Sequence, residues 1–193
     1  MVDAARRRRD PEARRRAIVG AAAELIVEVG VDAITHRMVA ARADVPLGAT
    51  TQYFDTLDDL RAAALKTLVA QIDEQMAEVR AVVAEHGATP AVLARIVHDG
   101  LADAKSAEAD RAVVTAAISD PQLRALARRW SSQLAGFFEA EHGDDRALAA
   151  AVFINGTIWQ AHLDDAPLPA RTIELALAGI LGDPHPQTDS TTD

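Results

Sequence analysis

Near the N-terminus of this chain, arginine is the residue type whose side chain can bind anionic groups. Seven of the first sixteen residues are arginines: Arg6, Arg7, Arg8, Arg9, Arg14, Arg15 and Arg16. A guanidinium group can form paired hydrogen bonds with a phosphate or a carboxylate, so residues 1–10 form a basic arm that can bind a polyanion. A solvated tail is the alternative, because most short charge runs behave in that way.

Residues for catalysis or metal binding are sparse. The chain has no cysteine, which excludes a disulfide scaffold, a thiolate zinc site and a cysteine nucleophile. No two histidines have the i, i+4 spacing of a helical metal site, and the neighbouring Asp164 and Asp165 have no evident partner. A phosphate-binding loop, a dinucleotide fingerprint and a GxSxG motif are all missing. We therefore expect no metal, no cofactor and no enzymatic activity.

Composition favours a helical protein. Of the 193 residues, 42 are alanine, 49% are apolar and 4% are aromatic. No apolar run approaches the ~20 residues that span a bilayer and no secretion signal is evident, so we expect a cytoplasmic protein. The net charge of −9 arises beyond residue 61, where nineteen acidic residues oppose ten basic ones. The first 61 residues balance ten arginines against ten acids, so the total charge does not exclude a polyanionic partner for that part.

Capping residues and helix breakers divide the chain into about nine predicted helices. Gly30 can end the first helix, Thr35 can cap the second and Thr56 can cap a long fourth helix. The first four predicted helices cover residues 11–29, 36–43, 47–54 and 57–86. The others begin at Pro90, Ser106, Pro121 and Asp144 and after Pro169, and the last three end near Gly143, His162 and Leu181. We expect an all-α fold.

The segment from Thr35 to Phe54 has the layout of a helix-turn-helix, with two short helices joined by a brief turn. The run ITHRMVAARADVPLGATTQYFDTLDDL, from Ile34 to Leu60, resembles the DNA-binding domain of TetR-type repressors. The resemblance covers residues 11–60, and the remainder matches only in the number and length of its helices. It implies an N-terminal three-helix DNA-binding domain and a C-terminal helical domain for ligand binding and dimerisation. The expected parts are a basic arm (1–10), the helix-turn-helix domain (11–56), the effector and dimer domain (57–181) and a flexible tail (182–193).

The resemblance also implies which residues meet DNA. The matching positions are Thr35, Arg37, Leu47, Gly48, Ala49, Thr51, Gln52 and Tyr53. Arg37 can bind a phosphate or read guanine, and Gln52 can read adenine. Leu47 and Ala49 can only touch or exclude a thymine methyl group. The small core that fixes the angle between the helices is expected to contain Val39, Val45 and Phe54.

Three positions depart from the family pattern. Asp44 stands in the turn where glycine is common, and aspartate tolerates the left-handed backbone that such a turn uses. Thr51 stands where tyrosine is frequent, and Leu57 stands where a lysine usually binds phosphate. The basic arm can compensate for the weaker backbone binding at these two positions, because each neutralised phosphate adds affinity through counterion release.

The last two predicted helices carry apolar stripes, and in TetR-type regulators such helices commonly form the dimer interface. The expected dimer residues are Val152, Asn155, Trp159, Ile173, Leu177 and Ile180. A dimer would place two recognition helices about one DNA turn, ~34 Å, apart on a palindromic site. The alternative is that both stripes pack only within their own chain.

An effector pocket lined mostly by apolar side chains is expected in the C-terminal domain. Its candidate residues are His98, Thr115, Trp130, Gln133, Phe137, Phe138, Asn155 and Trp159. Each aromatic residue among them is also a candidate for plain core packing.

The sequence therefore predicts a ligand-responsive transcriptional regulator, a repressor released from a palindromic operator by a small apolar or amphipathic molecule. Its expected partners are double-stranded DNA, that effector and a second copy of the chain, with no membrane. The resemblance implies that a ligand preferring the non-binding conformation would lower operator affinity through the long fourth helix. Two alternatives stay open: an all-helical enzyme with scattered catalytic residues, and an interaction module whose arginines bind an acidic protein or a membrane.

Overall fold

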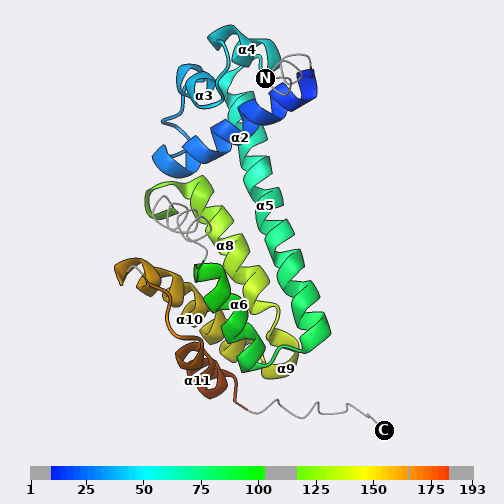
Figure 1. Ribbon diagram of the computed structural model, residues 1–193, viewed down its shortest axis with the longest axis vertical. Coiled ribbons are helices and arrows are strands. Elements are labelled where there is room, and N and C mark those ends of the chain that lie inside the picture. The colour runs from blue at the N-terminus through cyan, green and yellow to red at the C-terminus, as the bar shows by residue number, and fades with distance from the viewer. Residues whose placement is uncertain (1–9, 103–116, 165, 183–193) are drawn as a thin grey trace. The chain divides into compact units, whose positions relative to one another are not determined.

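The computed structural model describes residues 10–102, 117–164 and 166–182. Nine helices have both ends within these ranges, residues 117–119 are also helical, and no strand occurs there, which confirms the all-α fold (Figure 1). The expected helix start at Ser106, the candidate Thr115, most of the basic arm and nearly all of the tail lie outside the described residues. None of the described helices is long and apolar enough to cross a membrane.

The described residues group into two compact units. The first unit contains the residues up to Asp73 together with the segment 117–126, and the second contains the residues from Glu74 to Ala102 and from Ala127 onward. Two helices, α5 (Leu57–His86) and α8 (Pro121–Ala135), contribute residues to both units.

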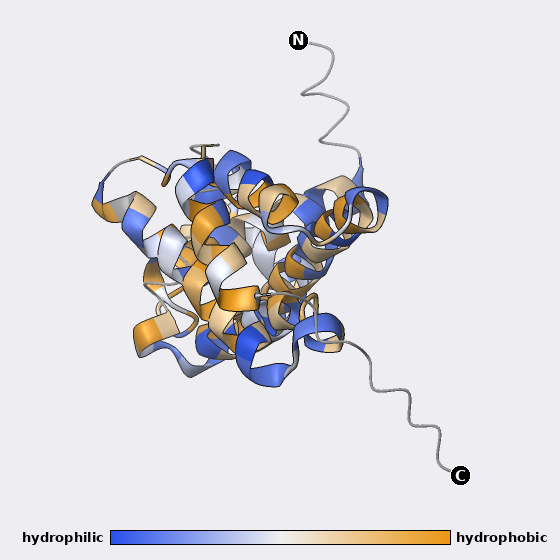
Figure 2. Ribbon diagram, turned by 90° about the horizontal axis from the view of Figure 1, so that it is seen from below, coloured by the Kyte–Doolittle hydropathy of each residue, from blue (hydrophilic) through white to orange (hydrophobic). Residues whose placement is uncertain are grey.

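The first unit begins with three helices, the second of which packs against the other two. They are α2 (Pro11–Val29), α3 (His36–Arg42) and α4 (Leu47–Tyr53). The carboxylate of Asp10 caps α2 by accepting a hydrogen bond from the Ala13 N–H at 3.0 Å, and Gly30 ends the helix with a φ of 90°. Apolar and hydrophilic residues both occur along the helices (Figure 2). The buried side chains of this unit include Ile18, Ile26, Ile34, Val39, Phe54 and Leu60.

The turn between α3 and α4 confirms the expectation for Asp44. This residue has a φ of 52°, the left-handed region that a short polar side chain tolerates best after glycine. Val39 and Phe54 are buried as predicted, and Val45 is half-buried. The small core expected between the helices is therefore present, with Val45 at its edge.

The second unit contains α6 (Pro90–Ala102), α9 (Glu139–His142), α10 (Asp144–Leu163) and α11 (Ala170–Leu181), besides parts of α5 and α8. Helix α11 packs against both α6 and α10. The core of this unit joins side chains from four helices and from the turn that follows α8. They include Leu93, Leu134, Phe138, Ala147, Ile154, Ile173 and Leu177.

The prediction of a single helix from Pro121 to Gly143 is wrong. Helix α8 ends at Ala135, and the N–H groups of Phe137 and Phe138 bond three residues back, to Leu134 and Ala135, in a tightened turn. Gly136 has a weak helix propensity, and the break lets Phe138 become fully buried in the core. A short helix, α9, then runs to Gly143.

Candidate nucleic-acid interface

The first turn of α3 presents two of the predicted DNA-binding residues. The hydroxyl oxygen of Thr35 caps the helix by accepting a hydrogen bond from the Met38 N–H at 3.3 Å. Thr35 and Arg37 are both exposed, so the Arg37 guanidinium is available to a phosphate or a base edge.

The next helix, α4, exposes one side and buries the other. Leu47 is 49% exposed, Gly48, Thr51 and Gln52 are exposed, and Tyr53 is half-buried. Ala49 is only 7% exposed, which corrects the expectation that it touches a thymine methyl group. It shares the buried side of the helix with Thr50, so a methyl group there packs inward and not toward a groove.

The hydroxyl groups of α4 donate within the helix. Thr50 donates to the carbonyl oxygen of Leu47 at 2.8 Å, and Thr51 donates to the carbonyl oxygen of Gly48 at 3.2 Å. The amide of Gln52 is an exposed side-chain donor of this helix, on which the small Gly48 and the apolar Leu47 are also exposed. This surface can pair with adenine and contact a thymine methyl group.

A clamp that the sequence analysis missed fixes the end of α3 against α2. The two terminal nitrogens of Arg42 donate to the two carboxylate oxygens of Glu28, each at 2.7 Å, and one also donates to Glu24 at 3.3 Å. The hydrogen bonds from Arg42 hold the pKa of Glu28 below its ordinary value, although partial burial opposes this. The bonds to Glu28 and then Glu24 raise the pKa of Arg42. These partners lie 14 and 18 positions away from Arg42, so no local spacing signal would have revealed the clamp.

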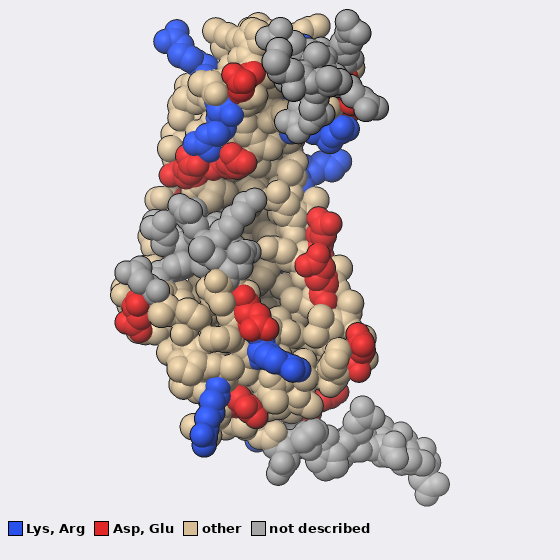
Figure 3. Space-filling model, in the orientation of Figure 1, with Lys and Arg blue, Asp and Glu red and all other residues tan. Residues whose placement is uncertain are grey.

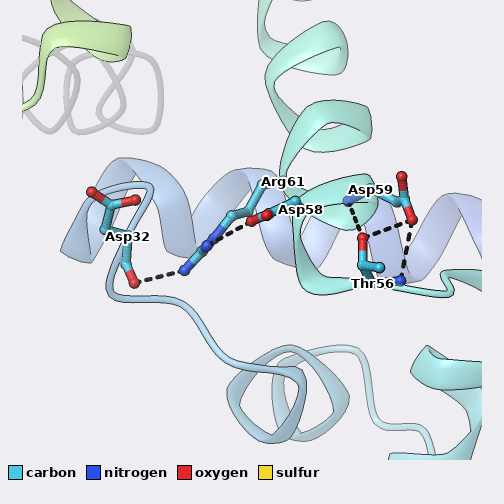
Figure 4. A network of polar contacts seen from close by, with 5 residues as sticks. All are labelled: Asp32, Thr56, Asp58, Asp59 and Arg61. Carbon is cyan, nitrogen blue, oxygen red and sulfur yellow. Dashed lines mark hydrogen bonds and ion pairs between the residues drawn. The ribbon is translucent and has the colours of Figure 1, made fainter.

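The turn between α2 and α3 is held by the start of α5 (Figure 4). Arg61 donates to the backbone carbonyl oxygen of Asp32 at 2.8 Å and pairs with the Asp58 carboxylate at 2.9 Å. At the same helix start, Thr56 accepts from the Asp59 N–H while the Asp59 carboxylate accepts from the Thr56 N–H and hydroxyl. The expected cap at Thr56 is thus confirmed as a reciprocal capping box.

Basic and acidic side chains lie side by side over the first unit's helices on the face seen in Figure 3. Arg15 has a structural role in this unit, because its guanidinium lies 5.2 Å from the centre of the Phe54 ring at the end of α4. Arg15 thereby helps to fix the end of the helix that carries Gln52.

The expected dimer residues separate into two classes. Val152 is 61% exposed and Trp159 is 49% exposed on α10, with Asn155 half-buried between them. Ile173 and Leu177 are fully buried in the core of their own chain, and Ile180 packs against the same core. The stripe predicted on α11 therefore packs internally, because α6 and α10 cover it. The exposed apolar side chains of these two helices are Leu148, Val152, Trp159, Leu163 and Leu175.

The effector candidates lie at several places in the second unit. His98 bonds through Nδ1 to the carbonyl oxygen of Leu168 at 2.9 Å, and Asn155 donates to the hydroxyl of Ser131 at 2.9 Å. Phe138 belongs to the core, and Trp159 is exposed on α10.

Two further candidates lie on α8 and one directly after it. The indole Nε1 of Trp130 is buried without a hydrogen-bond partner in the described part of the chain. Gln133 accepts a hydrogen bond from Arg80 at 3.4 Å, and the same guanidinium lies 5.9 Å from the Phe137 ring centre. Arg80 thus connects two of the candidates to α5. No group of three or more metal-binding side chains occurs among the residues that the structure describes.

Comparison with known proteins gives the family. No family model matches the chain. The multidrug binding protein EbrR, in its complex with proflavin, is 30% identical and aligns with a TM-score of 0.66 over 86% of this chain and 99% of that one. A TetR-family member from Streptomyces coelicolor, SCO1917, is also 30% identical, with a TM-score of 0.69 over 87% of this chain and 98% of that one.

A curated relative matches over a shorter stretch. The HTH-type transcriptional regulator PksA of Bacillus subtilis is 33% identical over 70 residues, which are 36% of this chain and 34% of that protein. The match therefore spans about a third of each protein. With the solved structures, which match over nearly their whole length, it leads to one conclusion: this chain belongs to the TetR family of transcriptional regulators.

Proposed function

We propose that this chain is a DNA-binding repressor that acts in the cytoplasm as a homodimer and leaves a palindromic operator when a small amphipathic molecule binds. The observation that carries the DNA-binding part is the exposure of Thr35, Arg37 and Gln52 on two short helices. Those helices are held in place by the Arg42 clamp and the Arg61 contact, so the surface is preorganised.

In the proposed dimer, the first unit of each copy would read one half-site of the palindrome. The Arg37 guanidinium would bind a phosphate or a guanine, the Gln52 amide would pair with adenine, and Leu47 would contact a thymine methyl group. A dimer is needed because one such surface engages only half of a palindromic site. The exposed apolar stripe of α10, with Val152 and Trp159, supports dimerisation through that helix.

The effector class is supported by EbrR, which has been crystallised with proflavin, malachite green and ethidium. These compounds are aromatic cations, and the part of this chain beyond residue 61 carries nineteen acidic against ten basic residues. Among the candidate residues, Trp130 combines an aromatic face with a buried donor that has no partner in the described ranges. We propose that the effector is an aromatic or amphipathic molecule bound near α8 and that it favours the conformation with low operator affinity.

Selection of bound fragments from a random DNA library, followed by a gel-shift assay, tests the function. We expect Arg37→Ala to weaken binding by about 1–3 kcal/mol and Gln52→Ala to relax the choice of adenine at one position. Arg95→Ala is the matched control, because it removes an exposed arginine from α6 in the second unit. An enzyme or a non-DNA interaction module would select no fragment, or would respond equally to Arg37→Ala and Arg95→Ala.

A further inference from the structure

Asp120 forms hydrogen bonds to two segments that are far apart in the sequence. Its Oδ1 accepts from the N–H groups of Gln122 at 2.8 Å and Leu123 at 3.2 Å and so caps α8. Its Oδ2 accepts from the N–H of Val31, 89 positions earlier, at 2.9 Å. Both carboxylate oxygens are therefore in use, one for a helix cap and one for the turn that follows α2.

The bond to Val31 satisfies a buried backbone group. Val31 is 2% exposed, and a buried N–H without an acceptor is strongly unfavourable. Burial raises the pKa of Asp120, but the hydrogen bonds from Val31, Leu123 and Gln122 outweigh that effect and lower it, so the group stays a carboxylate at neutral pH.

The turn held by Asp120 leads directly into the helix-turn-helix. The next residue is Asp32, whose backbone carbonyl oxygen accepts a hydrogen bond from the Arg61 guanidinium at 2.8 Å. Thr35 then caps α3. Two consecutive residues of the turn are thus bonded to groups at the starts of two different helices, α8 and α5. The direction in which α3 leaves the turn, and with it the position of Arg37, depends on both bonds.

We propose that Asp120 is a positioning residue for operator binding: by joining the first turn of α8 to Val31 it holds α3 in the orientation that presents Arg37. This inference rests on the proposed function, because operator binding is its readout. Without the hydrogen bond from the Val31 N–H to Asp120, the turn would adopt other conformations in which that N–H group is solvated or bonded elsewhere. The fraction of molecules competent to bind would fall, and the apparent affinity would fall by the same factor.

Asp120→Ser separates the two roles of the carboxylate. Serine is as good an N-cap as aspartate, but its single oxygen is used by the α8 N–H groups and leaves none for Val31. Asp120→Asn is a second variant, since its amide keeps one acceptor for the cap and turns an NH₂ group toward the Val31 N–H. Thr89→Ala is the control, because Thr89 caps α6 in the second unit by accepting from the Val92 N–H at 3.3 Å.

Two measurements on the full-length chain test the proposal: affinity for the DNA fragment that the wild type selects, and hydrogen exchange of the Val31 amide. We expect Asp120→Ser and Asp120→Asn to bind about tenfold more weakly and to exchange the Val31 amide about tenfold faster, with a melting temperature lowered no more than that of Thr89→Ala. Thr89→Ala should lower the melting temperature and change neither readout.

Unchanged affinity in both Asp120 variants would overturn the proposal, and so would an equal loss of affinity in Thr89→Ala, which would reveal a general stability effect. If the wild type selects no DNA, the proposed function fails. The exchange data then decide alone: unchanged exchange at Val31 overturns the role of Asp120, and faster exchange supports it.

Discussion

Arg42 and Glu28 form a bidentate ion pair in which each terminal guanidinium nitrogen lies 2.7 Å from a different carboxylate oxygen. The pair joins the last turn of α3 to the last turn of α2. A helix as short as α3 is not stable by itself, so its position depends on contacts of this kind. The planar fork of arginine also fixes an angle, which the single ammonium group of a lysine would not do.

The contribution of the Arg42–Glu28 pair should be visible when the free energy of unfolding of wild type and of Glu28→Gln is compared at different pH values. The folded-state pKa of Glu28 is held below its ordinary value of 4.5 by Arg42. The pair therefore stabilises the fold above that value, and its contribution is lost as the pH falls through the lowered pKa. In urea unfolding, wild type should exceed Glu28→Gln in stability at pH 7, and the difference should shrink as the pH falls below 4.5 and vanish once the pH lies below the lowered pKa.

Glu12→Gln is the control for that experiment, because Glu12 is an exposed glutamate in the first turn of α2. A difference between wild type and Glu28→Gln that stays constant from neutral to acid pH would contradict the role given to the ion pair.

The basic arm should contribute to DNA affinity without contributing to sequence choice. Deleting residues 1–9 removes four consecutive arginines, Arg6 to Arg9. The slope of log affinity against log salt should become shallower by about 0.9 for each phosphate that the shortened chain no longer neutralises. Fluorescence anisotropy on selected DNA at several salt concentrations measures this. Unchanged affinity together with an unchanged slope would assign the arm to the solvated-tail alternative.

Local signals in the sequence predicted the helix boundaries well, because a cap acts within three residues of itself. Thr35 and Thr56 were each expected at a helix start, Asp120 directly precedes the expected start at Pro121, and each of the three accepts the N–H bond of a cap. The second bond of Asp120, to Val31, joins residues 89 positions apart, and no local pattern encodes such a contact.

Apolar patterns predicted which side of a helix is buried but not what covers it. Ile173 and Leu177 form a regular stripe, and a stripe of this kind packs equally well on a second copy or on its own chain. The structure places α6 and α10 on it. For Ala49, a helix of seven residues with small side chains has too little apolar contrast to indicate which side faces inward.

The dimer surface that we propose on α10 can be tested by two contrasting substitutions. Val152→Glu places a charge on the exposed stripe of α10 and should convert the dimer to a monomer with little change in monomer stability. Ile173→Ala should leave the oligomeric state unchanged but lower the free energy of unfolding by about 2–5 kcal/mol, because it creates a cavity in the core. Light scattering and urea unfolding measure the two effects.

Val82→Glu is the control for the dimer surface, since Val82 is an apolar residue 40% exposed on α5. If the Val152→Glu protein has the same mass as the wild-type assembly, α10 does not form the dimer interface.

The two tryptophans allow the effector site to be located by fluorescence. Trp159→Phe leaves Trp130 on α8 as the only tryptophan, and Trp130→Phe leaves Trp159 on α10. Titration with malachite green should quench Trp130 saturably, and should affect Trp159 less because that side chain is about half exposed. Equal quenching of both, or quenching without saturation, would argue against an effector site beside α8.

Hydroxyl-radical footprinting on the selected DNA fragment tests most directly whether two copies of the chain present Arg37 and Gln52 to one duplex. We predict two protected stretches related by a two-fold axis, with centres about one helical turn, ~34 Å, apart. Arg37→Ala should abolish both stretches at a protein concentration where Arg95→Ala preserves them. A single protected stretch, or a footprint that Arg37→Ala leaves intact, would contradict this arrangement.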